Sequence, residues 1–329
     1  QWRSHDMGDM RLAFQLRALA HLAEQLLHLG VPLKIINAQT FDEVPAALLA
    51  LCQTLDLSAL HSIDEYPLNE RTRDSAVERL VSSAGIQVHR SVADVLAAPG
   101  QVLTQKGEPY TVFSPLYRRW QTVVAQVPAP LPKPQPQAHT DIPSDPLPDT
   151  WDGADASLGA ERWAADTDAA RTQLENFLSS RVQDYGEARD QPALAGTSQV
   201  SAHLAIGTLS PRQCLYAAQD AASADPVRFG GVEKWLSEIA WRDFYRQIVA
   251  QFDHVNWGYA FRREMDQLPW RIAPQELLAW QQGQTGYPLV DAAMRQLNET
   301  GWMHNRLRMV AAMFLSKHLL IDWRHGERY

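Results

Sequence analysis

Residues 1–90 alternate between two spacings of apolar positions. Apolar residues three and four apart are typical of helices buried on one face, and short apolar runs between turn residues are typical of strands. The pattern predicts helices over residues 11–29, 41–55 and 69–83 and strands over residues 32–37, 60–64 and 86–89. This alternation predicts a parallel sheet covered by helices. No Gly-x-Gly-x-x-Gly turn accompanies it, so dinucleotide binding in this part has no motif to support it.

Prolines dominate a later segment. Eight of them lie between Val127 and Asp149, which excludes a helix and favours an extended chain. From Thr167 onward, apolar residues again recur at three and four, with glycine or proline between the runs. We therefore predict an α/β domain over residues 1–125, a linker over 126–165 and an all-helical domain over 166–329.

The composition is that of an ordinary globular protein. The chain has 329 residues, 45% hydrophobic and 21% charged, which is enough for two domains. Cys52 and Cys214 are the only cysteines, so we expect no disulfide framework, no metal cluster and a reducing cytoplasm as the location. The N-terminus has no basic-then-apolar signal pattern, and the most apolar late run is broken by Ser316, Lys317 and His318, so we expect neither secretion nor membrane insertion.

Charge is distributed unevenly along the chain. The net charge is −8, yet residues 231–329 hold 12 Lys+Arg against 11 Asp+Glu, together with seven of the 11 Trp. A nucleic-acid-facing surface would therefore belong to this part, where flat aromatic rings could stack on bases. An aromatic-rich helical core is the alternative explanation of the same residues.

One predicted helix carries an unusual polar stripe. Within residues 235–245, four residues follow one another at helical spacing: Glu238, Trp241, Arg242 and Tyr245. An acid, a large ring and a cation are costly to bury unless they pair or meet a ligand. The alternative is an exposed salt bridge from Glu238 to Arg242, which would leave Trp241 unexplained.

A second polar helix begins near the segment Gly301–Met309. At helical spacing Asn305, Arg308, Met309 and Ala312 share one face, and Trp302, Arg306, Val310 and Met313 share another. We expect one face to pack and the other to meet a polar, flat ligand. His304, taken alone, would most often be a core or capping histidine.

A third motif, Gly196-Thr197-Ser198-Gln199-Val200-Ser201, has the form of a helix start. Thr197 or Ser198 could cap the helix, and the free amides of such an end attract phosphate. An ordinary N-cap without a ligand is the alternative.

These motifs, with Thr285–Arg295, strongly resemble the flavin domain of the DNA photolyase and cryptochrome family. The resemblance runs along the whole chain and is closest to the bacterial class I type that acts on cyclobutane pyrimidine dimers. It implies a Rossmann-like α/β domain followed by an all-α flavin domain. It also implies that the family's first strands precede this chain and that its last helices follow it.

The resemblance implies roles for named residues. FAD would be held by Tyr185, Thr197, Ser198, Gln199, Val200, Ser201, Trp235, Glu238, Arg242, Asn305 and Arg308. The repair site would consist of Glu238, Trp241, Arg242, Asn305 and Met309. Photoreduction of the flavin would use Trp270 and Trp323, and DNA would contact Arg189, Trp241 and Arg306. Asn69 and Glu70 would touch a folate antenna, methenyltetrahydrofolate, although a helix-capping Asn69 is an equal alternative.

The function that follows is light-driven repair of cyclobutane pyrimidine dimers by reduced FAD. His304 before Asn305 favours these dimers, and the presence of both Trp241 and Met309 favours repair over signalling. The expected partner is UV-damaged DNA, bound by a monomer without an obligate protein partner. The alternatives are a cryptochrome-type photoreceptor and a non-catalytic DNA- or nucleotide-binding remnant.

Overall fold

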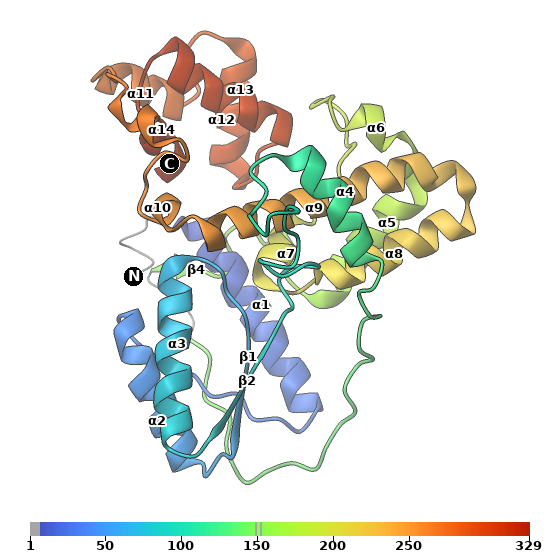
Figure 1. Cartoon of the computed structure of the whole chain (residues 1–329), viewed down its shortest axis with the longest axis vertical. Coiled ribbons are helices and arrows are strands. Elements are labelled where there is room, and N and C mark those ends of the chain that lie inside the picture. Colours follow the sequence, from blue (N-terminus) through green and yellow to red (C-terminus); the bar gives the residue numbers. More distant parts are fainter. Residues whose placement is uncertain (1–6, 149, 152) are drawn as a thin grey trace.

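The computed structural model describes residues 7–148, 150–151 and 153–329. Its first part contains α1 (Asp9–His28), η2 (Phe41–Glu43), α2 (Val44–Thr54), β1 (Ala59–Ile63), α3 (Leu68–Ser83), β2 (Gln87–Ser91), α4 (Phe113–Val124), β3 (Thr150–Trp151) and β4 (Ala154–Asp155). Helices then follow one another: α5 (Thr167–Ser180), η3 (Val182–Asp184), α6 (Tyr185–Ala188), α7 (Ser201–Ile206), α8 (Pro211–Ala224), η4 (Pro226–Arg228) and α9 (Phe229–Gln251). The last are α10 (Asp253–Asn256), η5 (Arg263–Gln267), α11 (Pro274–Gln281), α12 (Pro288–Thr300), α13 (Asn305–Met313), η6 (Phe314–His318) and α14 (Trp323–Arg328). The predicted fold class, a parallel-sheet α/β part before an all-helical part, is confirmed (Figure 1).

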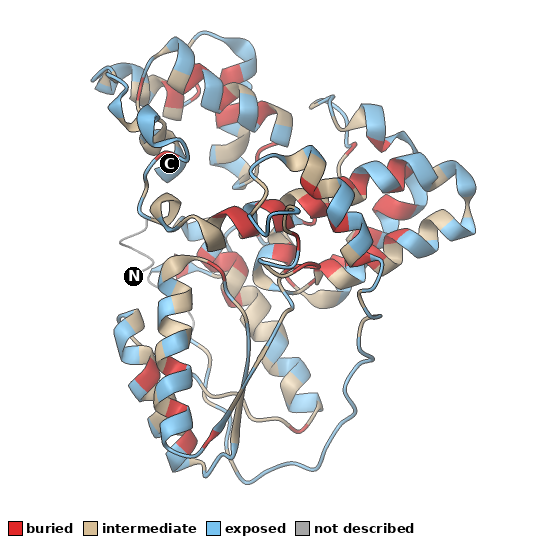
Figure 2. Cartoon of the chain, viewed as in Figure 1, coloured by how far each residue is buried: buried red, intermediate tan, exposed pale blue. Residues whose placement is uncertain are grey.

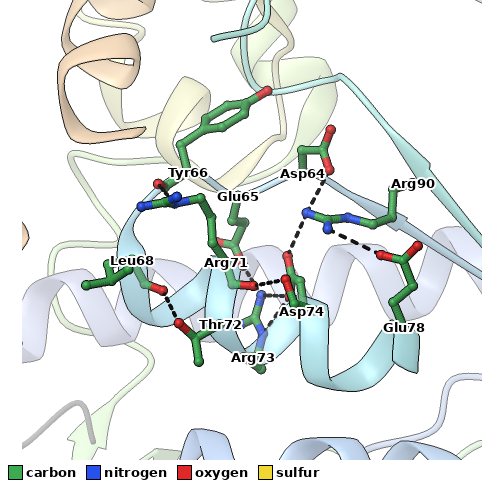
Figure 3. A network of polar contacts seen from close by, with 11 residues as sticks. Asp64, Glu65, Tyr66, Leu68, Arg71, Thr72, Arg73, Asp74, Glu78 and Arg90 are labelled. Atoms are coloured by element: carbon green, nitrogen blue, oxygen red, sulfur yellow. Dashed lines mark hydrogen bonds and ion pairs between the residues drawn. The ribbon is translucent and has the colours of Figure 1, made fainter. Parts of the chain in front are cut away.

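The strands β1 and β2 pair in parallel, with Ala59 opposite Gln87. The helices α2 and α3 pack on one face of this pair around a small core of Cys52, Val77, Val81 and Ile86. A polar network ties α3 to both strands: Arg90 of β2 reaches Asp64, Asp74 and Glu78 (Figure 3). The helices predicted over residues 11–29, 41–55 and 69–83 and the strands near 60–64 and 86–89 are confirmed within a few residues.

The strand predicted over residues 32–37 is wrong, because this segment joins no ladder among the described residues. Its backbone meets the proline-rich segment instead. The Leu33 amide donates to Ser144 Oγ at 3.1 Å, the Ile35 amide donates to Asp145 Oδ2 at 2.8 Å, and the Asp145 amide donates to Leu33 O at 2.8 Å. Side-chain acceptors therefore take the place that a second strand would have in a ladder.

The helix α1 belongs by sequence to the α/β part, yet its first half packs on the helical part. Phe14 lies edge-on to His203 of α7 with ring centroids 5.5 Å apart. Arg17 donates to the carbonyls of Leu158 and Trp163 at 2.8 and 3.1 Å. The domain boundaries at residues 125 and 165 remain a prediction, since packing crosses them.

The largest core surrounds α9, which lies across the centre of the molecule with α4, α7 and α8 against it (Figures 1 and 2). Buried residues of this core come from both sides of the linker and include Leu116, Trp120, Phe177, Trp235 and Phe244. The core fixes the rotation of α9 about its own axis, and therefore which of its side chains stay accessible.

A second core holds the last helices together. Trp280 of α11, Met294 of α12, and Leu307 and Ala311 of α13 lie within it, and the Trp280 indole donates to Ala311 O at 3.0 Å. Asn305, Arg308, Met309 and Ala312 all remain exposed, as expected for one face of α13. The second predicted face is not the packing face, since Trp302, Arg306 and Val310 are only half-buried and Met313 is exposed. A third face, which contains Leu307 and Ala311, packs instead. No described helix combines the length and the apolar character needed to cross a membrane.

Candidate functional site

The polar stripe predicted on α9 is present and incompletely buried. Glu238, Trp241 and Arg242 are half-buried, while Tyr245 is 60% exposed. Their neighbours on the other faces of the helix, such as Ile239, are buried in the large core. The stripe is therefore the face of α9 that this core leaves accessible.

A chain of ion pairs joins α9 to α13. Glu238 Oε1 accepts from Arg189 Nη1 at 2.6 Å, Arg189 Nε lies 3.6 Å from Asp190 Oδ1, and Asp190 pairs with Arg306. Hydrogen bonding by Arg306 lowers the pKa of Asp190. The alternative of a local Glu238–Arg242 salt bridge is wrong, because both residues pair elsewhere. Four charged groups, from α9, from the end of α6 and from α13, thus form one continuous network.

Arg242 is held by Asp94, from the N-terminal half of the chain, and by the backbone of α7. Its guanidinium pairs with the Asp94 carboxylate, donates to the Asp94 carbonyl, and donates to Leu204 O at 3.1 Å. Trp241 lies against a residue of the same half: its ring stacks on Phe113 of α4 with centroids 3.7 Å apart.

Asn305 and Met309 lie exposed at the start and on the outer face of α13. The charge network joins the helices that carry Trp241 and Asn305, but neither residue belongs to it, and neither lines the large cavity described below. The single cleft expected between them therefore remains a prediction. Arg189 and Arg306, the expected DNA contacts, are both engaged in the network, with Arg306 the more accessible of the two.

The expected cap by Thr197 or Ser198 is wrong. The helix α7 begins later, at Ser201, and its N-cap Val200 has no side-chain hydrogen bond. Ser198 is turned inward instead: its Oγ accepts from the Trp235 indole at 3.2 Å, and its carbonyl accepts from Gln173 at 2.8 Å. Gln199 then takes a left-handed conformation with φ of 56°, which separates the buried Ser198 from the helix.

A cavity of about 670 Å³ lies beside the start of α7. Ser201 and Arg308, two of the residues expected to hold FAD, line this cavity. Trp163 and Trp302 form an aromatic part of its wall. Although Arg308 is solvent-accessible, partial desolvation by the surrounding atoms lowers its pKa, and no carboxylate among the described residues pairs with it. A cation without a partner beside aromatic walls fits a ligand that carries phosphate and flat rings. The residues present therefore fit a flavin dinucleotide.

Tyr185 is buried next to Arg189 of the charge network. Its ring lies edge-on to Phe177 with centroids 5.6 Å apart, and the Arg189 guanidinium lies 5.4 Å from the ring centroid. Burial, and then the charge of Glu238, raise the pKa of the Tyr185 phenol. The phenol therefore stays neutral and can donate a hydrogen bond.

His304 is the N-cap of α13, so the capping alternative is confirmed. Its Nδ1 accepts from the Arg306 amide at 3.1 Å, which places the proton of the neutral ring on Nε2. Burial lowers the pKa of His304, so the neutral form is favoured. Nε2 is buried and has no partner among the described residues.

The expected electron-transfer residues lie on different segments. Trp323 is the first residue of α14, with the Arg324 guanidinium 4.7 Å from its ring centroid. The Trp270 indole nitrogen is buried without a described partner. Their joint role remains a prediction.

The antenna residues lie at the start of α3. Pro67 occupies the N-cap position, so the alternative of a helix-capping Asn69 is wrong. Asn69 instead lines a cavity of about 230 Å³ with Phe41 and Arg73, and Glu70 is half-buried one residue further on. A ligand at this cavity remains a prediction.

Three residues that shape the stripe were missed by the sequence reasoning: Asp94, Phe113 and Asp243. Asp243 is buried beside the stripe, and its Oδ2 accepts from Trp120 Nε1 at 2.8 Å. An acid inside an apolar helical pattern was the available signal for Asp243. Asp94 and Phe113 carry no local signal, since their partners lie more than a hundred positions away.

Comparisons with known proteins place the chain in a family. Residues 1–137 match the family model described as DNA photolyase, and residues 235–329 match the model described as the FAD binding domain of DNA photolyase. The chain is 39% identical to a deoxyribodipyrimidine photo-lyase of Vibrio cholerae, over 100% of this chain and 70% of that protein. It is 38% identical to a protein of the same name from Salmonella typhimurium, over 100% of this chain and 69% of the other.

Among solved structures, the fold is similar to that of a bacterial class III photolyase from Agrobacterium tumefaciens. The TM-score is 0.87 at 28% identity, and the match covers 98% of this chain and 66% of the other. The chain thus spans about two thirds of the length of these relatives. No group of three or more His, Cys, Asp or Glu within the described ranges could hold a metal ion. The chain belongs to the DNA photolyase family, and its residues 235–329 belong to the FAD-binding domain of that family.

Proposed function

We propose that this protein is a light-driven DNA repair enzyme, a carbon–carbon lyase that reverses cyclobutane pyrimidine dimers. The observation that carries the proposal is the charge network from Glu238 through Arg189 and Asp190 to Arg306, because it joins α9 and α13 beside Trp241. Family membership supplies the reaction class, and the names of the relatives supply the substrate.

FAD is the cofactor that the family implies, and when bound in its reduced form it supplies a light-excited electron donor. Arg308 and Ser201 would meet its phosphates from the wall of the large cavity. The other residues proposed to hold it are Tyr185, Thr197, Ser198, Gln199, Val200, Trp235, Glu238, Arg242 and Asn305. The Trp235 indole already donates a hydrogen bond to Ser198 Oγ, so these two residues would shape the site by supporting its lining.

The substrate would be a dimer turned out of the duplex, as enzymes that act on bases require, photolyases among them. Trp241 would offer a flat apolar surface, with Met309 as a second apolar contact. Glu238 would accept a hydrogen bond from an N–H on the polar edge of the dimer. Asn305 would donate from its amide and stabilise the charge that the dimer carries after accepting an electron. The two bonds that bridge the pyrimidines would break while these residues hold the dimer, and the overall reaction involves no net redox change.

The remaining parts of the proposal concern the surroundings of the site. Trp270 and Trp323 would pass electrons to the flavin, and Asn69 and Glu70 would touch a folate antenna such as methenyltetrahydrofolate. Arg189, Trp241 and Arg306 would contact UV-damaged DNA, where phosphate contacts position the duplex without reading its sequence. We further propose that the protein acts as a monomer in the cytoplasm.

The Glu238→Ala variant tests the repair site. Because it removes a hydrogen-bond acceptor next to the dimer, we expect the repair yield per absorbed photon to fall about two- to tenfold with lesion binding nearly unchanged. Yield is measured on an oligonucleotide that carries one thymine dimer, under blue light, with FAD-loaded protein. Glu233→Ala, an exposed acid of the same helix, is the control and should repair as the wild type does. An unchanged yield in Glu238→Ala would count against the assignment, and flavin photoreduction without any repair by the wild type would favour a photoreceptor.

The Arg308→Ala variant tests the flavin cavity. Loss of a charge-assisted phosphate contact of about 1.5–3 kcal/mol should weaken FAD binding about 10- to 150-fold. The dissociation constant is measured by the change in flavin fluorescence on titration. Lys317→Ala removes an exposed cation that does not line the cavity and should leave the affinity unchanged. Equal affinities of Arg308→Ala and wild type would exclude this cavity as the phosphate site.

A further inference from the structure

The indole of Trp241 is held by aromatic contacts from two helices. Phe113, the first residue of α4, stacks on it with ring planes 7° apart and centroids 3.7 Å apart. Phe244 lies edge-on to the indole at 5.6 Å and edge-on to Phe113 at 6.0 Å. Rotation of the indole about its side-chain bonds would break the stack, so Phe113 fixes the plane that Trp241 presents.

The two arginines of the same face are held by one carboxylate. Asp94 Oδ1 pairs with Arg242, and Asp94 Oδ2 accepts from Arg246 Nε at 2.8 Å. The Asp94 side chain is only 19% exposed, so these pairs are partly shielded from water. Arg242 and Arg246 lie one turn apart, which allows a single acid to orient both.

The loop that carries Asp94 is itself fastened to α9. Asp243 Oδ2 accepts from the amides of Leu96 and Ala97 at 3.0 and 2.9 Å, and from the Trp120 indole. Two acids therefore fasten the loop to α9. Asp94, on the loop, pairs with Arg242 of α9, and Asp243, on α9, accepts hydrogen bonds from the backbone of the loop. The loop and α4 are therefore each tied directly to α9.

We propose that Phe113 and Asp94 are positioning residues for dimer repair, with Phe113 setting the plane of Trp241 and Asp94 setting the direction of Arg242. Neither residue needs to touch the lesion. The inference rests on the proposed function, and it extends that function to a part of the chain outside the matched FAD-binding domain. The stripe of α9 would then be shaped by residues more than a hundred positions earlier in the sequence.

Lesion binding by variants of both residues tests the proposal, and this measurement needs neither flavin nor light. Phe113→Leu keeps an apolar side chain but removes the stacked ring, so we expect its dissociation constant for dimer-containing DNA to rise about three- to tenfold. Phe113→Tyr restores the ring and should restore the affinity. Asp94→Asn should produce a rise of similar size, since the amide cannot hold both arginines, and Asp94→Glu should recover part of the loss.

Two matched controls separate positioning from general damage to the fold. Phe261→Leu removes an aromatic contact with Phe252 that does not reach the stripe, and Asp253→Asn removes an ion pair with Arg71 that also joins distant segments. Both controls should keep the wild-type preference for damaged over undamaged DNA. Undamaged DNA should bind Phe113→Leu and Asp94→Asn as it binds the wild type, because only the orientation of Trp241 and Arg242 has changed.

The outcomes are distinguishable. A wild-type protein without preference for dimer-containing DNA would overturn the proposed function together with this inference. A wild-type preference that persists in Phe113→Leu and Asp94→Asn would overturn the inference alone. Equal losses of affinity for damaged and undamaged DNA would also overturn it, because they would indicate a merely structural role.

Discussion

Replacing Gly231 with alanine is expected to destabilise the protein by about 3 kcal/mol or more, the upper end of the range for overpacked sites. An added Cβ at this position of α9 would lie 1.7 Å from the carbonyl oxygen of Val182 and 3.2 Å from the Cα of Gln183. Both atoms are backbone, so no side-chain rotation relieves the overlap. The turn η3 would have to move away from α9, and it leads directly into Tyr185 and the segment that carries Arg189.

Gly230→Ala is the matched control for this prediction. Nothing lies within 4 Å of a Cβ at Gly230, which is also a residue of α9. Alanine there should stabilise the helix by up to about 1 kcal/mol, because glycine has the larger backbone entropy in the unfolded chain. The free energy of unfolding is measured by urea denaturation followed by circular dichroism. Wild-type stability of Gly231→Ala would show that the approach of η3 to α9 is not as close as the structure has it.

The stability of the protein is expected to fall between about pH 4 and pH 7 because of Asp243. Burial raises the pKa of this carboxyl to about 7, against the opposing effect of its hydrogen bonds from Trp120, Ala97 and Leu96 and of the nearby Arg242. In the unfolded chain an aspartate has a pKa of about 4, so within this window the folded state binds more protons. The stabilising contribution is complete below about pH 4 and is lost as the pH rises through about 7. Three pH units at about 1.4 kcal/mol each give roughly 4 kcal/mol.

The Asp243→Asn variant isolates this contribution, because it cannot titrate. The unfolding free energy of the wild type minus that of the variant should fall from pH 4 to pH 7 and then stay level. Urea denaturation at one-unit steps of pH gives the difference directly, and titration of other groups cancels. A difference that rises with pH would mean that the three N–H donors outweigh burial and hold the pKa below its ordinary value.

Much of the α/β part could be predicted from the sequence, because helices such as α1 and α3 need only local periodicity and favourable burial of one face. The strand expected over residues 32–37 could not be, since an apolar run does not specify what will pair with it. Here Ser144 and Asp145 provide the acceptors. The inference of a ladder was therefore wrong.

The sequence predicted which residues form the polar site better than it predicted the ion-pair partners of those residues. The stripe of Glu238, Trp241 and Arg242 follows from helical spacing, and the structure leaves it accessible. The partners are long-range: Glu238 pairs with Arg189, 49 positions away, and Arg242 pairs with Asp94, 148 positions away. Spacing along one helix favoured a local pair, but tertiary packing brought carboxylate and guanidinium groups of other segments closer.

The same limit explains the misassigned cap. Ser198 has the side chain of a good N-cap, and its position before a helix made that interpretation natural. The Trp235 indole N–H, 37 positions further on, donates to the Ser198 hydroxyl instead. A buried indole N–H requires an acceptor, and this requirement is visible only when both segments are placed in space.

The proline-rich segment has a consequence for the behaviour of the protein at high concentration. The amides of Leu33 and Ile35 and the carbonyl of Leu33 lie along one side of the chain, and an edge of this kind readily recruits a strand from a neighbouring molecule. The segment around Asp145 occupies that backbone, and Lys34 binds Asp145 from the other side. Because Pro143 and Pro146 lack an N–H, the outer side of the segment offers few donors for another strand to join. The proline-rich segment therefore occupies backbone groups of Leu33 and Ile35 with which a strand of a neighbouring molecule could otherwise pair.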